Sequence, residues 1–147
     1  MKNLEKTIRK AFSCTALLNT LSSEDAREAN HEISRLDNAS AVKLLPLLML
    51  KEMHGAGVEN SCPNGDHLVY FLDGALLKRE KDGSLTPRDG EASLVLRKLK
   101  YDDFKDYTKE QTHAITLWLK QVAVTKYGKL CPVDIASALT FWEARIK

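Results

Sequence analysis

The sequence predicts a mainly α-helical fold of about five or six helices, with one possible short β-hairpin between residues 68 and 99. Three observations predict it. Apolar residues recur at helical spacing along much of the chain, capping residues precede several of these segments, and glycine and proline residues separate them. A chain of 147 residues has a common size for one domain and needs no cross-link to be stable. We therefore expect a single globular helical domain over residues 1–147.

The first two predicted helices are amphipathic. Residues 4–21 place apolar side chains near helical spacing and basic side chains on the opposite side. Ser22 or Ser23 can end this helix and cap a second one over residues 23–36, which has acidic residues in its first turn. The apolar stripe of the second helix is thin, so we expect it to lie on the surface.

The third predicted helix is the centre of the core. It begins at a capping Ser40, ends at Gly55 and is apolar almost all round, which is typical of a buried helix. Pro46 lies inside it. Because proline removes a backbone donor and clashes with the preceding turn, we expect a kink or a break there.

The middle of the chain leaves alternatives open. Residues 68–78 fit a helix, which we favour, but the pair Asp73-Gly74 also fits a hairpin turn between apolar runs. Residues 79–92 are polar with two Asp-Gly pairs and predict a loop or a short hairpin. Residues 93–99 could form a strand or a helical turn, because periodicity cannot decide at that length.

The last third of the chain has the clearest pattern. Thr108 and Gln111 form a capping box that begins a helix with one apolar face and a predicted end near Gly128. Pro132 then opens a last helix. A short connection should pair these two helices. Their predicted core residues are Ala114, Ile115, Trp118, Leu119 and Val122 in the first, and Ile135, Ala138, Leu139, Trp142 and Ile146 in the second.

The charge balance excludes some function classes. The 22 basic and 20 acidic residues give a net charge of +2, which predicts neither strong attraction to nucleic acid nor a mimic of a polyanion. The basic runs are short and diluted by acids, and no glycine-rich phosphate loop is present. Binding of nucleic acid and hydrolysis of nucleotides are therefore not expected.

The cysteines and the apolar segments bear on the cellular compartment of the protein. Three cysteines without close pairs argue against a disulfide framework. Residues 1–21 mix charges with apolar residues, whereas a signal peptide needs an unbroken apolar stretch, and no window approaches a membrane span. We expect a protein of the reducing cytoplasm with no membrane partner.

One loop offers a candidate metal site. His54, Cys62 and His67 are zinc-type ligands within a segment rich in glycine, and Asp66 is adjacent. Their spacing matches no compact zinc module, so a solvated loop is the favoured interpretation. Cys62 near histidines could also be a nucleophile, but no catalytic signature surrounds it. We predict no metal ligand, no cofactor and no catalytic residue.

Two hypotheses concern the segment before the capping box. Asp102, Asp103 and Asp106 could divide acid and base roles, although the lysines between them favour a solvated helix face. Tyr101 and Tyr107 alternate with these acids, as the aromatic residues of protein interfaces do. The alternative is that the aromatic residues, with Phe104 between them, pack inward. We predict a partner-binding site made of Tyr101, Asp102, Asp103, Asp106 and Tyr107.

Three features together carry a resemblance. They are Leu44-Leu45-Pro46-Leu47-Leu48, the segment from Phe104 through Thr108-Lys-Glu-Gln111 to Trp118-Leu119, and Ala138-Leu139-Thr140-Phe141-Trp142. Over roughly the last two-thirds, the chain resembles a group of uncharacterised small helical bacterial proteins. Because these motifs consist of packing and capping residues, the resemblance implies a fold and no chemistry. By analogy, it suggests an immunity or antitoxin partner.

These observations lead to one expected function and one alternative. We expect a non-enzymatic, cytoplasmic bacterial protein that binds another protein, such as an immunity-type partner that occludes the site of a toxin. The alternative is a small metal-binding domain, or a metal-dependent enzyme, that uses the loop over residues 54–67.

Overall fold

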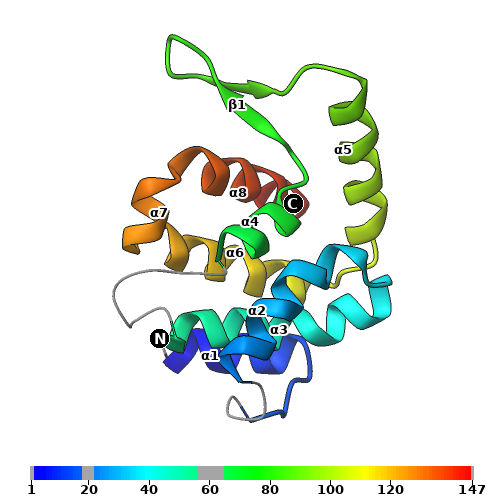
Figure 1. Ribbon diagram of the computed structural model, residues 1–147, viewed down its shortest axis with the longest axis vertical. Helices are drawn as coiled ribbons and strands as arrows, with labels where there is room; N and C mark the ends of the chain where they lie inside the picture. The colour runs from blue at the N-terminus through cyan, green and yellow to red at the C-terminus, as the bar shows by residue number, and fades with distance from the viewer. Residues whose placement is uncertain (1, 18–21, 56–64, 147) are drawn as a thin grey trace. The chain divides into compact units, whose positions relative to one another are not determined.

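A computed structural model describes residues 2–17, 22–55 and 65–146 (Figure 1). The predicted mainly α fold with a short hairpin between residues 68 and 99 is confirmed. The chain divides into two compact units, Met1–Phe71 and Leu72–Lys147. The single domain expected over residues 1–147 stays a prediction. Within the described ranges, no helix has both the length and the apolar composition that a membrane crossing requires.

The first helix of unit 1 is shorter than predicted. Helix α1 (Lys2–Ala11) ends well before residue 21 because Ser13 adopts a left-handed conformation, with a φ of 51°. The Ser13 amide donates to the Lys10 carbonyl over 3.3 Å, and the Cys14 amide donates to the Arg9 carbonyl over 2.8 Å. This pair of bonds is a Schellman motif, which satisfies the last carbonyls of a helix and reverses the chain.

The second helix begins as predicted. The Ser22 hydroxyl accepts a hydrogen bond from the Asp25 amide over 3.1 Å and caps α2 (Ser23–Glu32). A short 3₁₀ helix, Ile33–Arg35, follows and buries Ile33. The predicted helix over residues 23–36 is therefore an α-helix followed by a tighter final turn.

Helix α3 (Asn38–Gly55) is the buried helix that the sequence predicts, but it begins earlier. It begins before Ser40 because the Asp37 carboxylate accepts from the Ser40 amide over 2.8 Å. The helix also continues through Pro46 without a break. A proline removes one backbone hydrogen bond, and the fully buried leucines on both sides, Leu45 and Leu48, stabilise the helix across it. Helix α4 (Gly65–Leu72) then runs to the unit boundary.

Unit 2 is built on two helices that pack side by side, α6 (Lys109–Ala123) and α8 (Pro132–Ile146). The predicted capping box of α6 is present in full, since Thr108 and Gln111 each bond the other's backbone amide over 3.1 Å. All five predicted core residues of α6 are buried. In α8, Ile135, Ala138 and Trp142 are buried as predicted, whereas Leu139 is half-buried and Ile146 is 42% exposed.

The predicted end of α6 near Gly128 is wrong. The Thr125 hydroxyl donates to the Val122 carbonyl over 2.6 Å and accepts from the Gly128 amide over 3.2 Å. One side chain thus ends α6 at Ala123 and begins the short helix α7 (Lys126–Leu130). Serine and threonine hydroxyls compete with helical bonds in this way at helix ends.

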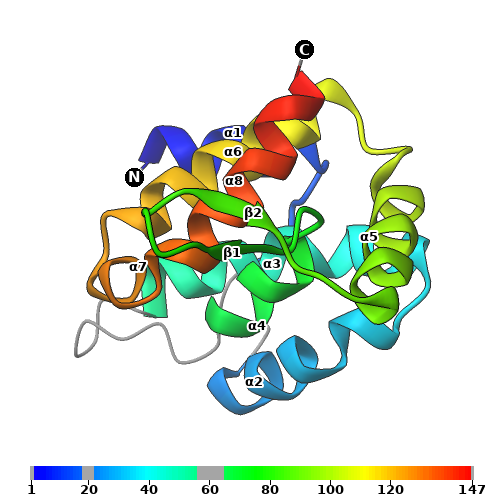
Figure 2. The same cartoon turned by 90° about the horizontal axis from the view of Figure 1, so that it is seen from above.

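The hairpin turns at Asp82-Gly83 and not at Asp73-Gly74. Strands β1 (Leu77–Arg79) and β2 (Leu85–Pro87) pair antiparallel, with Lys78 opposite Thr86. Gly83 occupies the turn with a φ of 88°, a conformation that glycine adopts without strain. Strand β1 packs against α8, and Figure 2 shows the hairpin lying across that helix.

Residues 93–99, left open between strand and helix, belong to α5 (Glu91–Phe104). Gly90, with a φ of 107°, redirects the chain into this helix. The Arg97 guanidinium donates to the Arg88 carbonyl over 3.0 Å and ties α5 to the end of the hairpin. Otherwise α5 packs sparsely against other elements, and Figure 1 shows it at the side of the hairpin and α8.

Candidate functional site

The predicted partner-binding residues lie at the end of α5 and in its connection to α6. Tyr101 is 60% exposed. Asp102, Asp103 and Asp106 are also exposed, whereas Tyr107 is half-buried. Among the described residues, Asp102 and Asp106 form no ion pair. The connection therefore presents acidic side chains to solvent beside one exposed tyrosine.

Part of the aromatic sequence pattern packs inward. Phe104 is buried, and its ring centre lies 5.3 Å from that of Tyr107 and 4.9 Å from that of Trp142. The rings of Tyr107 and Trp142 are 5.7 Å apart. The inward packing considered for these aromatic residues thus holds for Phe104 and partly for Tyr107. Such offset and edge contacts stabilise the junction of α5, α6 and α8.

Tyr107 keeps its proton. Burial raises the pKa of its hydroxyl, and the nearby charge of Asp103 raises it further. A phenol that stays neutral can donate a hydrogen bond across the physiological pH range.

Tyr101 and Tyr107 line one pocket, with a volume of about 570 Å³. The pocket lies within unit 2, and the three predicted aspartates are not among its lining residues. Small side chains form part of its wall: Ala75, Thr112, Thr140 and Ala144. Its size is within the range of pockets that hold small ligands.

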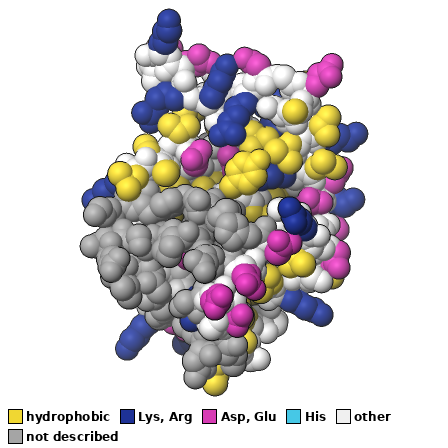
Figure 3. Space-filling model, in the orientation of Figure 1, with side chains coloured by type: hydrophobic (Ala, Val, Ile, Leu, Met, Phe, Trp, Pro, Cys, Tyr) yellow, Lys and Arg dark blue, Asp and Glu magenta, His cyan; other side chains and the backbone are white. Residues whose placement is uncertain are grey.

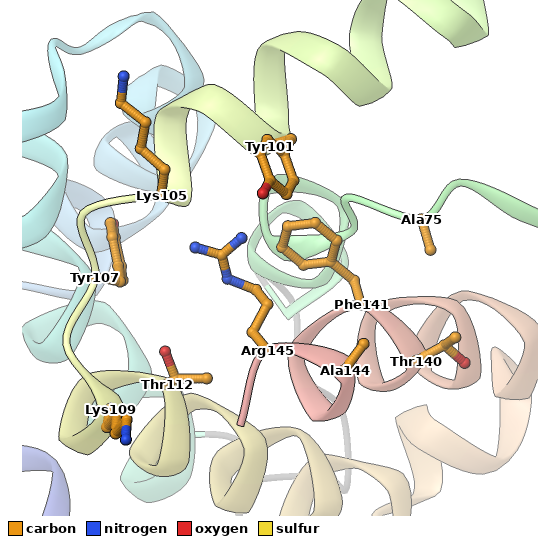
Figure 4. A pocket seen from close by; sticks show the side chains of 10 residues that line it. All are labelled: Ala75, Tyr101, Lys105, Tyr107, Lys109, Thr112, Thr140, Phe141, Ala144 and Arg145. Carbon is orange, nitrogen blue, oxygen red and sulfur yellow. The ribbon is translucent and has the colours of Figure 1, made fainter. Parts of the chain in front are cut away.

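Arg145, from the last turn of α8, is central to this pocket. Figure 4 shows its guanidinium between Tyr107 and Lys105 on one side and Tyr101 and Phe141 on the other. The guanidinium carbon lies within cation–π distance of three ring centres: 5.1 Å from Phe141, 5.5 Å from Trp142 and 5.7 Å from Tyr101. Burial lowers the pKa of this guanidinium from its ordinary value.

The hydrogen bonds of Arg145 leave part of its guanidinium free. Nη2 donates to the carbonyl of Phe104 at the end of α5. The buried Nε has no hydrogen-bond partner among the described residues. A buried donor without an acceptor is costly and is uncommon in folded proteins.

The sequence patterns did not find Phe141 and Arg145 as site residues. Their four-residue spacing places both on one side of α8, which was a usable signal. Nothing local, however, joins this helix end to Tyr101 on α5. That proximity arises only from the packing of unit 2.

A second surface feature is the outer face of α5. Leu94, Val95 and Leu99 are 60%, 58% and 53% exposed. Figure 3 shows hydrophobic side chains at the surface along this helix, among acidic and basic ones. Contiguous exposed apolar side chains of this kind mark interaction sites more often than isolated ones do.

A buried Ser–Asp pair in unit 2 is structural. Ser137 donates to the Asp73 carboxylate over 2.7 Å, and both side chains are almost fully buried. Both are engaged with backbone amides of the adjoining turn. A hydroxyl held in this way has no access to substrate, so this pair fixes the fold.

The candidate metal ligands lie outside what the structure describes in side-chain detail. This holds for His54, Cys62 and His67, so the metal hypothesis stays a prediction. Within the described residues, no group of histidine, cysteine and acidic side chains is arranged to hold a metal ion. Cys14 and Cys131 are free thiols of intermediate burial.

Comparison with known proteins adds no assignment, since no protein-family model, no curated protein and no solved structure matches the chain.

Proposed function

We propose that the chain is a non-enzymatic protein-binding protein and that α5, with the segment joining it to α6, supplies the binding surface. One observation carries the proposal. Helix α5 exposes four large apolar side chains, Leu94, Val95, Leu99 and Tyr101, each more than half exposed, with the exposed Lys98 and Asp102 among them, and it packs sparsely against other elements. A surface of leucine, valine and tyrosine side chains is suited to burial against another protein.

The charges beside this face indicate the partner's chemistry. Asp102, Asp103 and Asp106, with one exposed lysine between them, Lys105, give the apolar face a mainly acidic rim. Acidic groups at the edge of an interface steer association with a surface of opposite charge. The expected partner is therefore a protein with an apolar patch bordered by lysine and arginine.

The specific role we propose is that of an immunity- or antitoxin-type partner in a bacterial cytoplasm. In this role the α5 surface would cover the site of a toxin and so block access of the toxin to its target. The support for the role is the resemblance of the sequence to small helical bacterial proteins, together with the acidic rim. Sites that act on nucleic acid are commonly basic, and an acidic rim would complement such a site.

The proposal is tested by capture of a partner from the source cells with surface variants of the chain. The tagged wild type should enrich a specific protein, identified by mass spectrometry, that carries a basic patch. Leu94→Ala/Leu99→Ala and Asp102→Lys should each reduce its recovery roughly tenfold, because they remove the centre and the charge of the surface.

Leu130→Ala is the matched control, because Leu130 is 73% exposed on α7 and lies outside the proposed surface. It should leave recovery unchanged, and circular dichroism should show that all variants fold alike. Equal recovery by the wild type and the α5 variants would refute the surface assignment. A cell extract from which the wild type enriches no protein would refute the proposed function.

A further inference from the structure

Three basic side chains from different elements of unit 2 are among the residues that line the pocket around Arg145. Arg145 comes from α8, Lys105 from the connection after α5, and Lys109 from the first turn of α6. No carboxylate is among the described lining residues. The acids next to lining residues in sequence, Asp102, Asp106 and Glu110, are exposed and do not line it, although the charge of Asp103 acts on Tyr107. Arg145 is therefore the cation at the centre of the pocket, Lys105 and Lys109 lie at its edge with the Lys105 ammonium turned away from Arg145 (Figure 4), and no described acid lines it.

The Arg145 guanidinium has unused donors in this setting. The Phe104 carbonyl accepts from Nη2, and Nε is too deeply buried to meet a ligand. No described acceptor bonds Nη1, which is therefore the donor left for one. Guanidinium donors form their strongest bonds with phosphate or carboxylate oxygens. The aromatic rings around Arg145 compensate its charge only in part. An anion in the pocket would supply the oppositely charged partner.

The rest of the pocket suits a flat apolar group. Tyr101 and Phe141 present rings on one side of the guanidinium, and Figure 4 shows both beside the open centre of the pocket. Ala75 and Ala144 add apolar lining without filling the space. A volume of about 570 Å³ accommodates a ring together with its charged substituent.

The amino end of α6 also favours an anion in the pocket. Lys109 and Thr112, from its first turn, line the pocket, and the amino end of a helix carries a partial positive charge that favours phosphate. The capping box leaves the Lys109 and Glu110 amides without an intrahelical acceptor. This feature adds to the side-chain cations.

We propose that this pocket is a binding site for a phosphate monoester attached to a flat ring, as in a nucleoside monophosphate or a phenyl phosphate. The Arg145 guanidinium, with Lys105 and Lys109 at the edge of the pocket, matches the nearly double charge of a phosphate monoester at neutral pH better than the single charge of a carboxylate. The rings of Tyr101 and Phe141 contact the flat group. The site does not depend on the proposed protein-binding role, although Tyr101 borders both.

The test is a titration of the whole chain, followed by NMR and calorimetry, with phenyl phosphate and adenosine monophosphate as probes. Phenol, adenosine and benzoate are the matched compounds that lack the phosphate. Both phosphate probes should bind saturably, at least roughly tenfold more tightly than their uncharged counterparts and than benzoate. The Nε–H resonance of Arg145 should shift on binding. Whichever phosphate binds more tightly identifies the ring, purine or phenyl.

Variants distinguish specific binding in the pocket from nonspecific attraction of the phosphate to basic side chains. Arg145→Met should weaken phosphate binding roughly tenfold or more. Arg145 also bonds the end of α5, so Lys105→Ala/Lys109→Ala provides a second variant at two exposed positions. It should weaken binding roughly threefold to tenfold with the fold intact. Lys98→Ala removes an exposed lysine of α5 outside the pocket and should change nothing.

Four results would overturn the proposal. They are a lack of saturable binding by either phosphate probe, benzoate binding as tight as that of phenyl phosphate, uncharged probes that bind equally well, and a Lys98→Ala variant that loses as much affinity as Lys105→Ala/Lys109→Ala.

Discussion

The Ser137 hydroxyl donates a hydrogen bond of 2.7 Å to the Asp73 carboxylate and joins α8 to the turn between α4 and β1. The same hydroxyl accepts from the Leu77 amide over 2.7 Å, and Asp73 also accepts from the Leu76 amide over 2.9 Å. Leu76 has a φ of 49°, which is unusual for a leucine. The two buried side chains therefore hold a strained turn against the helix that carries Arg145.

The first prediction concerns this pair. Ser137→Ala should lower the free energy of unfolding by about 2–3 kcal/mol, because it leaves the buried Asp73 carboxylate and the Leu77 amide each short of a partner. Urea denaturation measures the loss. Thr140→Ala is the control, because Thr140 is exposed and its hydroxyl donates only to the Ala136 carbonyl of its own helix. Equal losses in the two variants would contradict the role given to Ser137.

The second prediction concerns the close approach of Gly74 to Phe141. A Cβ atom at residue 74 would overlap the Phe141 ring, so Gly74→Ala forces that ring to move. We expect a loss of about 1–3 kcal/mol in the free energy of unfolding. Adding Phe141→Leu, which removes the ring, should recover part of this loss in a double-mutant cycle.

Gly83→Ala is the control, because it has a backbone conformational cost but no steric clash. No atom lies within 4 Å of the added Cβ at Gly83, but its φ is 88°. The expected loss is about 1 kcal/mol, and Phe141→Leu should leave it unchanged. If Phe141→Leu rescues neither variant or rescues both, the contact between Gly74 and Phe141 does not cause the effect.

Features set by near neighbours in sequence could be predicted. The Thr108 and Gln111 capping box depends on residues three positions apart, and the structure contains both of its hydrogen bonds. The buried stripe of α6 follows from helical spacing alone. The start of α8 at Pro132 is likewise a local signal.

Features that depend on small energy differences or on distant contacts could not be predicted. Ser13 ends α1 in a conformation that glycine usually adopts, so the sequence gives no sign of the stop. Residues 93–99 have an apolar pattern that fits strand or helix equally. The pocket unites Tyr101 with Arg145 through tertiary packing, and no pattern along the chain encodes that contact.

The third prediction tests the end of α1. Ser13→Gly should raise the free energy of unfolding of unit 1 by about 0.5–1 kcal/mol, because glycine adopts a φ of 51° without the steric cost that serine incurs. Lys6→Gly, at an exposed position within α1, should instead lower it by about 1 kcal/mol. Thermal denaturation of the two variants measures both effects. A destabilising Ser13→Gly would show that the serine side chain itself stabilises the helix end.

The last prediction concerns Lys100, which is only 8% exposed. Burial lowers the pKa of its amine to about 8. The charges of Asp73 and Asp103 oppose this lowering, and that of Arg88 adds to it. Between about pH 8 and the ordinary lysine value of 10.5, the folded protein therefore binds fewer protons than the unfolded chain, and its stability rises with pH.

The destabilising contribution of Lys100 is fully present below its folded pKa and is lost as the pH rises through this window. From about pH 7 to about pH 9.5, the wild type should gain about 2 kcal/mol of stability relative to Lys100→Met, which has no group to titrate there. Urea denaturation of both proteins across the range measures the difference and cancels the titration of the other groups. Parallel stability curves would mean that the Lys100 amine reaches solvent and titrates normally in the folded protein.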